Sequence, residues 1–316
     1  MDTKQTSLKG VLILFLTAII WGTSFVAQSI GMEKIEAFTY NGIRTLMGAL
    51  VLLPVILIRL NTGKGEATFS NYAKEIFTPK TFKYGVILGV VFALASNFQQ
   101  FAFYYSTAGK IAFITSLYMF FVPILGLFIK KRVPLLTWLC VACGFVGLYF
   151  ISVKKGQMSE INKGDILALV CAFFYGIQIL CVEKYANEVD GVVLSCLQFF
   201  VGGLISVVLM FIFETPVISD ILAAGKPLLY SGIMSCGVAY TLQIIGQKYA
   251  EATVASLIMC TESVFAVISS AIILNEFMTT RETIGCAIVF GAVVLSHMPS
   301  RKTKKCHPEE QCSEGS

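Results

Sequence analysis

Apolar runs of about 20 residues recur along the whole chain and constrain its fold more than any other feature. A helix of about 20 residues crosses the hydrocarbon core of a bilayer. Only 14% of the 316 residues are charged and 56% are hydrophobic, whereas a soluble domain carries about 25% charged residues. This pattern excludes an ordinary soluble domain and predicts an all-α integral membrane protein with ten transmembrane helices. The spans are expected at 8–30, 37–59, 82–104, 108–129, 134–153, 164–186, 191–213, 227–247, 252–274 and 280–298.

The basic residues predict how these spans are oriented, because cytoplasmic loops of membrane proteins carry an excess of Lys and Arg. Arg44 lies within a span, and most of the other basic residues fall on the side of the N-terminus. The exceptions are Lys34, Lys110, Lys154, Lys155, Lys163, Lys226 and Arg281. We therefore expect both termini in the cytoplasm, and we do not interpret the net charge of +5 as a sign of nucleic-acid binding.

The two halves of the chain resemble each other in sequence. The segment KGVLILFLTAIIWG (9–22) aligns with KGDILALVCAFFYG (163–176), and YSTAGKIAFITSLYMF (105–120) aligns with YAEATVASLIMCTESV (249–264). The alignment places Arg44 opposite Gln198, Asn97 opposite Thr241, Gln99 opposite Gln243 and Tyr118 opposite Glu262. We expect a first repeat at 8–153, a second at 164–298 and a disordered cytoplasmic tail at 299–316.

An odd number of spans in each repeat inverts the second repeat relative to the first. Inverted repeats are typical of secondary transporters, which bind substrate near the bilayer midplane between the repeats. The alternative is an old duplication that is retained only for helix packing. The pattern favours transport.

Three further segments are informative: Trp21-Gly22 in the first span, YSTAGKIAFITSLYMFFVPI (105–124) and TESVFAVISSAIILNEFMTTRETIG (261–285). They resemble the EamA-type family of the drug/metabolite transporter superfamily. The resemblance covers roughly 8–298 and implies a basket of ten helices around a central cavity. It also implies a proton-linked or facilitated carrier of small metabolites, often an exporter of amino acids or their derivatives. One departure is Ser263, where the family often has a proline after the glutamate, and this weakens the expectation of a hinge there.

Two charged side chains are expected deep in the membrane, where each costs about 2.5–3.5 kcal/mol on insertion scales. Glu262 falls near the middle of the ninth span. It is interpreted as a proton-coupling site, as a site for a substrate amine, or as a structural partner of Arg44 or a backbone-bonded acid. Arg44 falls in the second span, where it either holds a substrate carboxylate or packs against helices and extends to the interface.

Amide and aromatic side chains in the spans form the rest of the expected site. In lipid, a single amide often serves only to hydrogen-bond neighbouring helices, but several of these residues recur at matched repeat positions, which favours a shared cavity. Trp21, Ser24 and Gln28 share one face of the first helix, and Gly22 permits a close neighbour there. The expected substrate-binding residues are Trp21, Ser24, Gln28, Arg44, Asn97, Gln99, Tyr118, Tyr175, Gln198, Tyr240 and Gln243.

Lys110 opens the fourth span, where it either contributes to an outer gate or only reaches the membrane interface. The two histidines, His297 and His307, stand at the C-terminal end, so the spans offer no clustered His for an intramembrane enzyme. We expect no enzyme, no cofactor and no metal. A channel and a non-transporting scaffold are alternatives.

The sequence therefore predicts a secondary active transporter in a bacterial inner membrane, as a monomer or homodimer. It is expected to export a small metabolite by alternating access, with protons as the coupling ion. An importer of a sugar or another small solute, and a carrier without ion coupling, are the rival functions.

Overall fold

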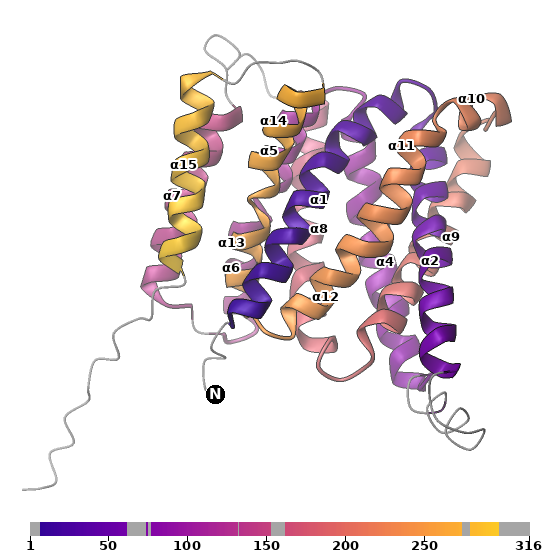
Figure 1. Cartoon of the computed structure of the whole chain (residues 1–316), viewed down its shortest axis with the longest axis horizontal. Helices are drawn as coiled ribbons and strands as arrows, with labels where there is room; N and C mark the ends of the chain where they lie inside the picture. Colours follow the sequence, from indigo (N-terminus) through magenta and orange to yellow (C-terminus); the bar gives the residue numbers. More distant parts are fainter. Residues whose placement is uncertain are drawn as a thin grey trace, which may run out of the picture.

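The computed structural model describes residues 7–61, 74, 77–131, 133–152, 162–273 and 279–296. In this part of the chain, every regular element is a helix (Figure 1). In the first half the helices are α1 (Leu8–Met32), α2 (Ala37–Asn61), α4 (Pro79–Ala102), α5 (Ala108–Thr115), α6 (Tyr118–Phe128) and α7 (Leu135–Ser152). In the second half they are α8 (Lys163–Tyr185), α9 (Gly191–Phe213), α10 (Ile218–Ala223), α11 (Gly225–Leu229), the π-helix η1 (Tyr230–Tyr240), α12 (Thr241–Gln247), α13 (Ala252–Met259), α14 (Glu262–Ile273) and α15 (Thr280–Ser296).

Within the described residues, eight helical segments are long and apolar enough to cross a membrane, counting α5–α6, α11–α12 and α13–α14 as one segment each. Two shorter apolar segments belong to α7 and α15, which run side by side. These ten segments lie at the ten positions expected from the sequence. The prediction of an all-α membrane protein is confirmed. The tail at 299–316 and both histidines lie outside the described residues.

Apolar and polar side chains are distributed as a membrane requires. Large apolar side chains such as Phe128, Leu135 and Phe211 are exposed on the outside of the bundle, whereas Asn41 and Gln178 are fully buried. Polar groups in lipid must find partners inside the protein. The buried polar side chains therefore lie in the interior, among a larger number of buried apolar ones.

The helix pairings of the two halves follow the same scheme. Helix α4 packs on α9 as η1 packs on α2, and α1 packs on α14 as α8 packs on α6. The equivalent helices α2 and α9 pack on each other, and so do α7 and α15. The start of α1 and the end of α15 lie on one side of the bundle (Figure 1), which is called the N-terminal face below.

Local signals in the sequence fix several helix starts. The side chain of Ser7 accepts a hydrogen bond from the backbone N–H of Gly10 at the start of α1. At the start of α8, Asn162 and Asp165 form a reciprocal capping box. Such side chains satisfy backbone donors that the first helical turn leaves unpaired.

The fourth and ninth spans are interrupted in the middle. In the fourth span α5 ends at Thr115 and α6 begins at Tyr118; in the ninth, α13 ends at Met259 and α14 begins at Glu262. These two interruptions stand at matching repeat positions.

The ninth span is therefore interrupted next to Glu262 although Ser263 stands where the family often has a proline, and a hinge there is not tested. Two side chains at the interruption bond to carbonyls of the preceding turn. Cys260 Sγ donates to Leu257 O at 2.9 Å and Thr261 Oγ1 donates to Ile258 O at 2.7 Å. Side-chain bonds of this kind compete with the backbone hydrogen bonds of a helix.

Candidate functional site

A closed pocket lies between the two halves, at the level of the two helix interruptions. Its free volume is about 30 Å³, which is room for water in this conformation, so a small-molecule substrate needs the surrounding helices to move apart. Every side chain that lines it is buried. The lining residues are Trp21, Ser24, Phe25, Gln28, Arg44, Gln99, Thr115, Tyr118, Tyr175, Gln178, Ile179, Ser235, Tyr240, Gln243 and Glu262.

Helix α1 contributes one wall of the pocket with Trp21, Ser24 and Gln28. The Trp21 ring packs on Tyr240, with ring centroids 4.6 Å apart, and Gln28 Nε2 donates to Ser24 O and to Ser24 Oγ. Trp21 Nε1 and Gln28 Oε1 are buried without a hydrogen-bond partner in the described part of the chain. A buried donor or acceptor without a partner costs free energy, so both atoms are suited to a polar ligand.

Gly22 brings α1 unusually close to α14. A Cβ atom at this position would lie 2.4 Å from Phe265 Cβ and 2.7 Å from the carbonyl oxygen of Glu262. The glycine thus holds the α1 wall against the helix that carries Glu262.

Arg44 enters the pocket from α2 as a buried cation. Its Nε donates to Asn41 Oδ1 at 3.0 Å, and its guanidinium lies over the Tyr40 ring at 5.7 Å from the centroid. No carboxylate of the described residues lies within ion-pair distance, and no other hydrogen bond to the guanidinium is found among them. The terminal nitrogens of Arg44 are therefore available to an anion.

Asn97 does not line the pocket but supports Arg44 from behind. Asn41 Nδ2 donates to Asn97 Oδ1 at 2.8 Å and to Ser96 Oγ at 2.9 Å. The same amide group of Asn41 presents its oxygen to Arg44. Asn97 thus orients Asn41, and Asn41 orients the guanidinium.

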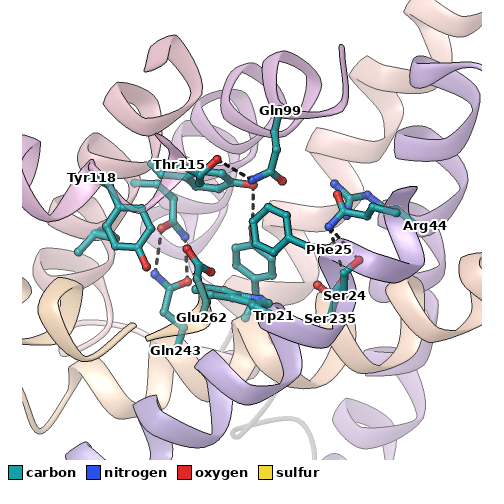
Figure 2. A pocket seen from close by; sticks show the side chains of 15 residues that line it. Trp21, Ser24, Phe25, Arg44, Gln99, Thr115, Tyr118, Ser235, Gln243 and Glu262 are labelled. Atoms are coloured by element: carbon teal, nitrogen blue, oxygen red, sulfur yellow. Dashed lines mark hydrogen bonds between the residues drawn. The ribbon is translucent and has the colours of Figure 1, made fainter. Parts of the chain in front are cut away.

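Glu262 enters the pocket at the first turn of α14. Its Oε1 lies 3.3 Å from Ser116 Oγ, within hydrogen-bonding distance. Among the described residues, no cation lies within ion-pair distance of this carboxyl. Figure 2 shows Arg44 and Glu262 entering from opposite sides, with the rings of Phe25 and Trp21 between them. Direct ion pairing of Glu262 with Arg44, one of the interpretations left open by the sequence, is absent from this conformation.

Amides and phenols form the remaining polar wall. Gln243 Nε2 donates to Gln178 Oε1 at 3.0 Å, and Tyr240 Oη donates to Tyr175 Oη at 2.8 Å. Gln99 Nε2 donates to Thr115 Oγ1 at 3.3 Å. These bonds connect helices and also fix the side chains that face the pocket.

Gln198 lies outside the pocket, behind this wall. Its Oε1 accepts from Gln178 Nε2 at 3.2 Å, while its own Nε2 is buried without a partner in the described part of the chain. The structure thus brings ten of the twelve residues expected in the pocket to its surface, and leaves Asn97 and Gln198 one layer behind it.

Five lining residues were not among those expected from the sequence: Phe25, Thr115, Gln178, Ile179 and Ser235. Phe25 completes the i, i+3, i+4, i+7 stripe of α1, so helical spacing could have found it. Ser235 lies in the π-helix, where an α-helical period does not apply. Ile179 carries no chemical signal in the sequence.

Lys110 lies away from the pocket, on the face opposite the N-terminal face. Its Nζ pairs with Asp165 Oδ2 at 2.7 Å and joins α5 to α8. On the same face, both carboxylate oxygens of Glu214 accept backbone N–H groups at the start of α2, from Phe38 and Thr39 at 2.7 Å. The role of Lys110 in a gate stays a prediction.

Ion pairs also connect helices at the N-terminal face. Lys131 pairs with Glu183, whose other oxygen accepts the backbone N–H of Ala252 at 3.1 Å. Lys80 pairs with Glu188 at 2.6 Å, and its hydrogen bond holds the pKa of the Glu188 carboxyl below its ordinary value. Polar contacts therefore connect helices at both faces of the bundle, on either side of the pocket.

Comparison with known proteins gives a consistent result. The EamA-like transporter family model matches residues 8–153 and 162–298. An uncharacterized transporter of Archaeoglobus fulgidus is 29% identical over 89% of this chain and 83% of its own length. The uncharacterized transporter YoaV of Bacillus subtilis is 22% identical over 89% of this chain and 94% of its own length. A solved crystal structure covers 91% of this chain and 96% of its own, with a TM-score of 0.72 and 17% identity, and so shares the fold.

Proposed function

This chain belongs to the EamA-like transporter family, and on that premise we propose that it is a secondary active transporter of a small zwitterion. The proposed substrate is an amino acid or a derivative of one, and the proposed mechanism is alternating access. The observation that carries this proposal is the pair of opposite charges, Arg44 and Glu262, that face one closed pocket without facing a partner charge.

The chemistry of the pocket fits a molecule with a carboxylate and an amine. The planar guanidinium of Arg44 can donate two parallel hydrogen bonds to a carboxylate. Glu262 can accept a hydrogen bond from an ammonium group on the opposite side of the pocket. Trp21 and Phe25 lie between the two charges and provide apolar contact for a side chain (Figure 2).

Alternating access is supported by how the pocket is closed. Contacts at the N-terminal face include the pair Lys131–Glu183, and contacts at the other face include the pair Lys110–Asp165. Partly exposed ion pairs of this kind contribute little free energy individually, about 0–1 kcal/mol. Such pairs can break and re-form as one face opens and the other closes.

Glu262 is the proposed coupling site for protons. An ionised carboxylate in a water-poor pocket is costly, so a proton, or the amine of a substrate, relieves that cost. A proton bound in one conformation and released in another would link a gradient to substrate movement.

The proposed location is the inner membrane of a bacterial-type cell, with the N-terminal face in the cytoplasm. The excess of Lys and Arg on that side supports this orientation, and both ends of the described bundle lie there. Reporter fusions to Met1 and Ser316 test it. Outward transport is the proposed direction, and flux assays in right-side-out and inside-out vesicles test that direction.

A binding screen tests the proposed substrate class. The purified protein in lipid nanodiscs is heated with single amino acids and with two derivatives of each, the carboxamide and the N-acetyl form. A ligand that binds the folded state raises the unfolding temperature. We expect an amino acid to bind, and both derivatives to bind about ten- to a hundredfold more weakly, because charge-assisted hydrogen bonds contribute about 1.5–3 kcal/mol.

A matched pair of variants assigns the effect to Arg44. Arg44→Gln should bind the acid and the carboxamide equally well. Arg281→Gln, which alters an arginine that lies over Tyr149 and Phe150 outside the pocket, should discriminate as the unmodified protein does. Stabilisation by a neutral sugar, and by no amino acid or derivative, would refute the zwitterion proposal and support the rival importer.

A further inference from the structure

The interruptions of the fourth and ninth spans meet at two serines that the proposed transport mechanism does not use. Ser116 follows the last residue of α5, and Ser263 follows Glu262 in the first turn of α14. Both side chains are buried. Together with Glu262 they form a continuous hydrogen-bonded cluster between the two halves.

Three hydrogen bonds join this cluster in series. Glu262 Oε1 and Ser116 Oγ are 3.3 Å apart, Ser116 Oγ and Ser263 Oγ are 2.7 Å apart, and Ser263 Oγ is 3.0 Å from the carbonyl oxygen of Ala112. The same carbonyl accepts the backbone N–H of Ser116 at 3.0 Å, which is the last helical bond of α5. The cluster therefore connects the acid on α14 to the end of α5.

The number of protons decides how many of these bonds exist at once. Each hydrogen bond needs one proton, and each hydroxyl supplies one. Two serines supply two protons for three bonds. The Ala112 carbonyl supplies none. The third proton is available only when Glu262 is a carboxylic acid, which then donates to Ser116, Ser116 to Ser263, and Ser263 to Ala112 O.

We propose that Glu262 carries a proton in this closed conformation and that Ser116 and Ser263 transmit its presence to the end of α5. This inference rests on the proposed function, because Glu262 is its coupling site, and adds two positioning residues to it. When the proton leaves, Ser116 turns to donate to the carboxylate. Ser263 then has one proton for two acceptors, and one bond between α14 and the fourth span is lost.

Other groups near Glu262 do not supply the missing proton. Arg44 is the charged side chain that shares its pocket, and it lies on the opposite side. On the helices that pack against α14, Lys9 lies over the Tyr249 ring and Lys110 pairs with Asp165. The remaining titratable neighbours are phenols and thiols, whose ordinary pKa values are above neutrality. They are Tyr118, Tyr175, Tyr240, Cys140, Cys143, Cys171 and Cys260.

Infrared spectroscopy tests the proposal directly, with the proton as the probe. Spectra of the full-length protein in nanodiscs are recorded against pH, and subtraction of the Glu262→Gln spectrum isolates the carboxylic-acid band of Glu262. We expect this band at neutral pH without substrate. Its absence there would overturn the proposal.

Two serine variants test the relay. The Ser263 hydroxyl is not hydrogen-bonded to the Glu262 carboxyl. Ser263→Ala nevertheless removes two of the three hydrogen bonds from the protonated state and one of the two from the ionised state. The pH at which half of the band disappears should fall by about 0.5–1 unit, because one net hydrogen bond contributes about 0.5–1.5 kcal/mol. Ser263→Thr, which keeps the hydroxyl, should restore the original midpoint.

Ser269→Ala is the matched control. Ser269 is a buried serine of the same helix, and among the described residues its hydroxyl bonds only to the Phe265 carbonyl one turn earlier, at 2.6 Å. It should leave the midpoint unchanged. An unchanged or higher midpoint in folded Ser263→Ala would overturn the relay. Because no transport is measured, such a result is distinguishable from a failure of the proposed substrate or coupling.

Discussion

Helix α2 in the first half brings Arg44 to the pocket, whereas the equivalent residue of α9 in the second half is Gln198, which lies behind Gln178. In the ninth span, the second half supplies the charge instead. Glu262 faces the pocket there, and its equivalent in the first half, which also lines the pocket, is the neutral Tyr118. Each half thus contributes one charge where the other contributes a neutral side chain. In the proposed mechanism, the symmetric helix pairings would serve the opening of either face, and the unequal charges would favour one orientation of the proposed zwitterion.

The two halves keep a shared hydrogen bond behind this difference. Asn41 Nδ2 donates to Asn97 Oδ1 at 2.8 Å in the first half. The equivalent residues in the second half are Ser195 and Thr241, and Thr241 Oγ1 donates to Ser195 Oγ at 2.9 Å. A hydrogen bond between neighbouring helices is thus present at equivalent positions of both halves, with different side chains. Only the first-half contact also orients a charged residue.

The largest expected effect is the difference in transport between a variant of Glu262 and a variant of its repeat equivalent, Tyr118. Glu262→Gln should abolish substrate accumulation driven by a pH gradient in proteoliposomes, because an amide neither binds nor releases a proton in this range. Exchange of labelled for unlabelled substrate at equal pH should continue. Tyr118→Phe should keep pH-driven accumulation. A Glu262→Gln protein that folds and still accumulates substrate fully would place coupling elsewhere.

A smaller effect is expected on stability, between variants of Gly22 and of its repeat equivalent, Gly176. A Cβ at Gly22 would lie 2.4 Å from Phe265 Cβ, whereas one at Gly176 would lie 2.9 Å from Phe121 Cβ. Overpacking costs about 1–3 kcal/mol, so Gly22→Ala should lower the thermal unfolding midpoint more than Gly176→Ala does. Equal midpoints for the two variants would show that the approach of α1 to α14 is not the tighter one.

The smallest effect concerns the shared hydrogen bond. Asn97→Ala should weaken amino-acid binding about three- to tenfold, because one net hydrogen bond that orients Asn41, and through it Arg44, is lost. Thr241→Ala removes the equivalent bond without a charged residue nearby and should leave the affinity within twofold. Titration calorimetry on both variants measures the difference. A loss of the same size in both would mean that the bond matters only for helix packing.

Much of the fold could be predicted from the sequence. Bilayer thickness restricts the length of each span, and the sequence similarity of the two halves restricts how the spans are arranged. The wall formed by Trp21, Ser24 and Gln28 followed from helical spacing in the same way. The positions of Asn97 and Gln198 did not follow, because hydropathy and spacing identify a buried polar residue without showing whether it faces a cavity or a neighbouring helix.

Two further features depend on tertiary contacts. Lys110 could be placed at a span end, but its bond to Asp165 depends on how α5 packs on α8. The interruption at Cys260 and Thr261 could not be read from the sequence, and it coincides with two side-chain bonds to carbonyls that only the structure shows. Helix propensities of single residues do not account for such bonds.

The π-helix η1 determines which side chains of the eighth span face the pocket. Ser235 and Tyr240 both face the pocket five residues apart, the spacing that an i→i+5 helix places on one side. In an α-helix, residues five apart differ by about 140° around the axis. Rewinding η1 as an α-helix would turn one of the two side chains away from the pocket. A change of winding within the eighth span would therefore alter which residue lines the pocket, with no piston or tilt of the helix as a whole.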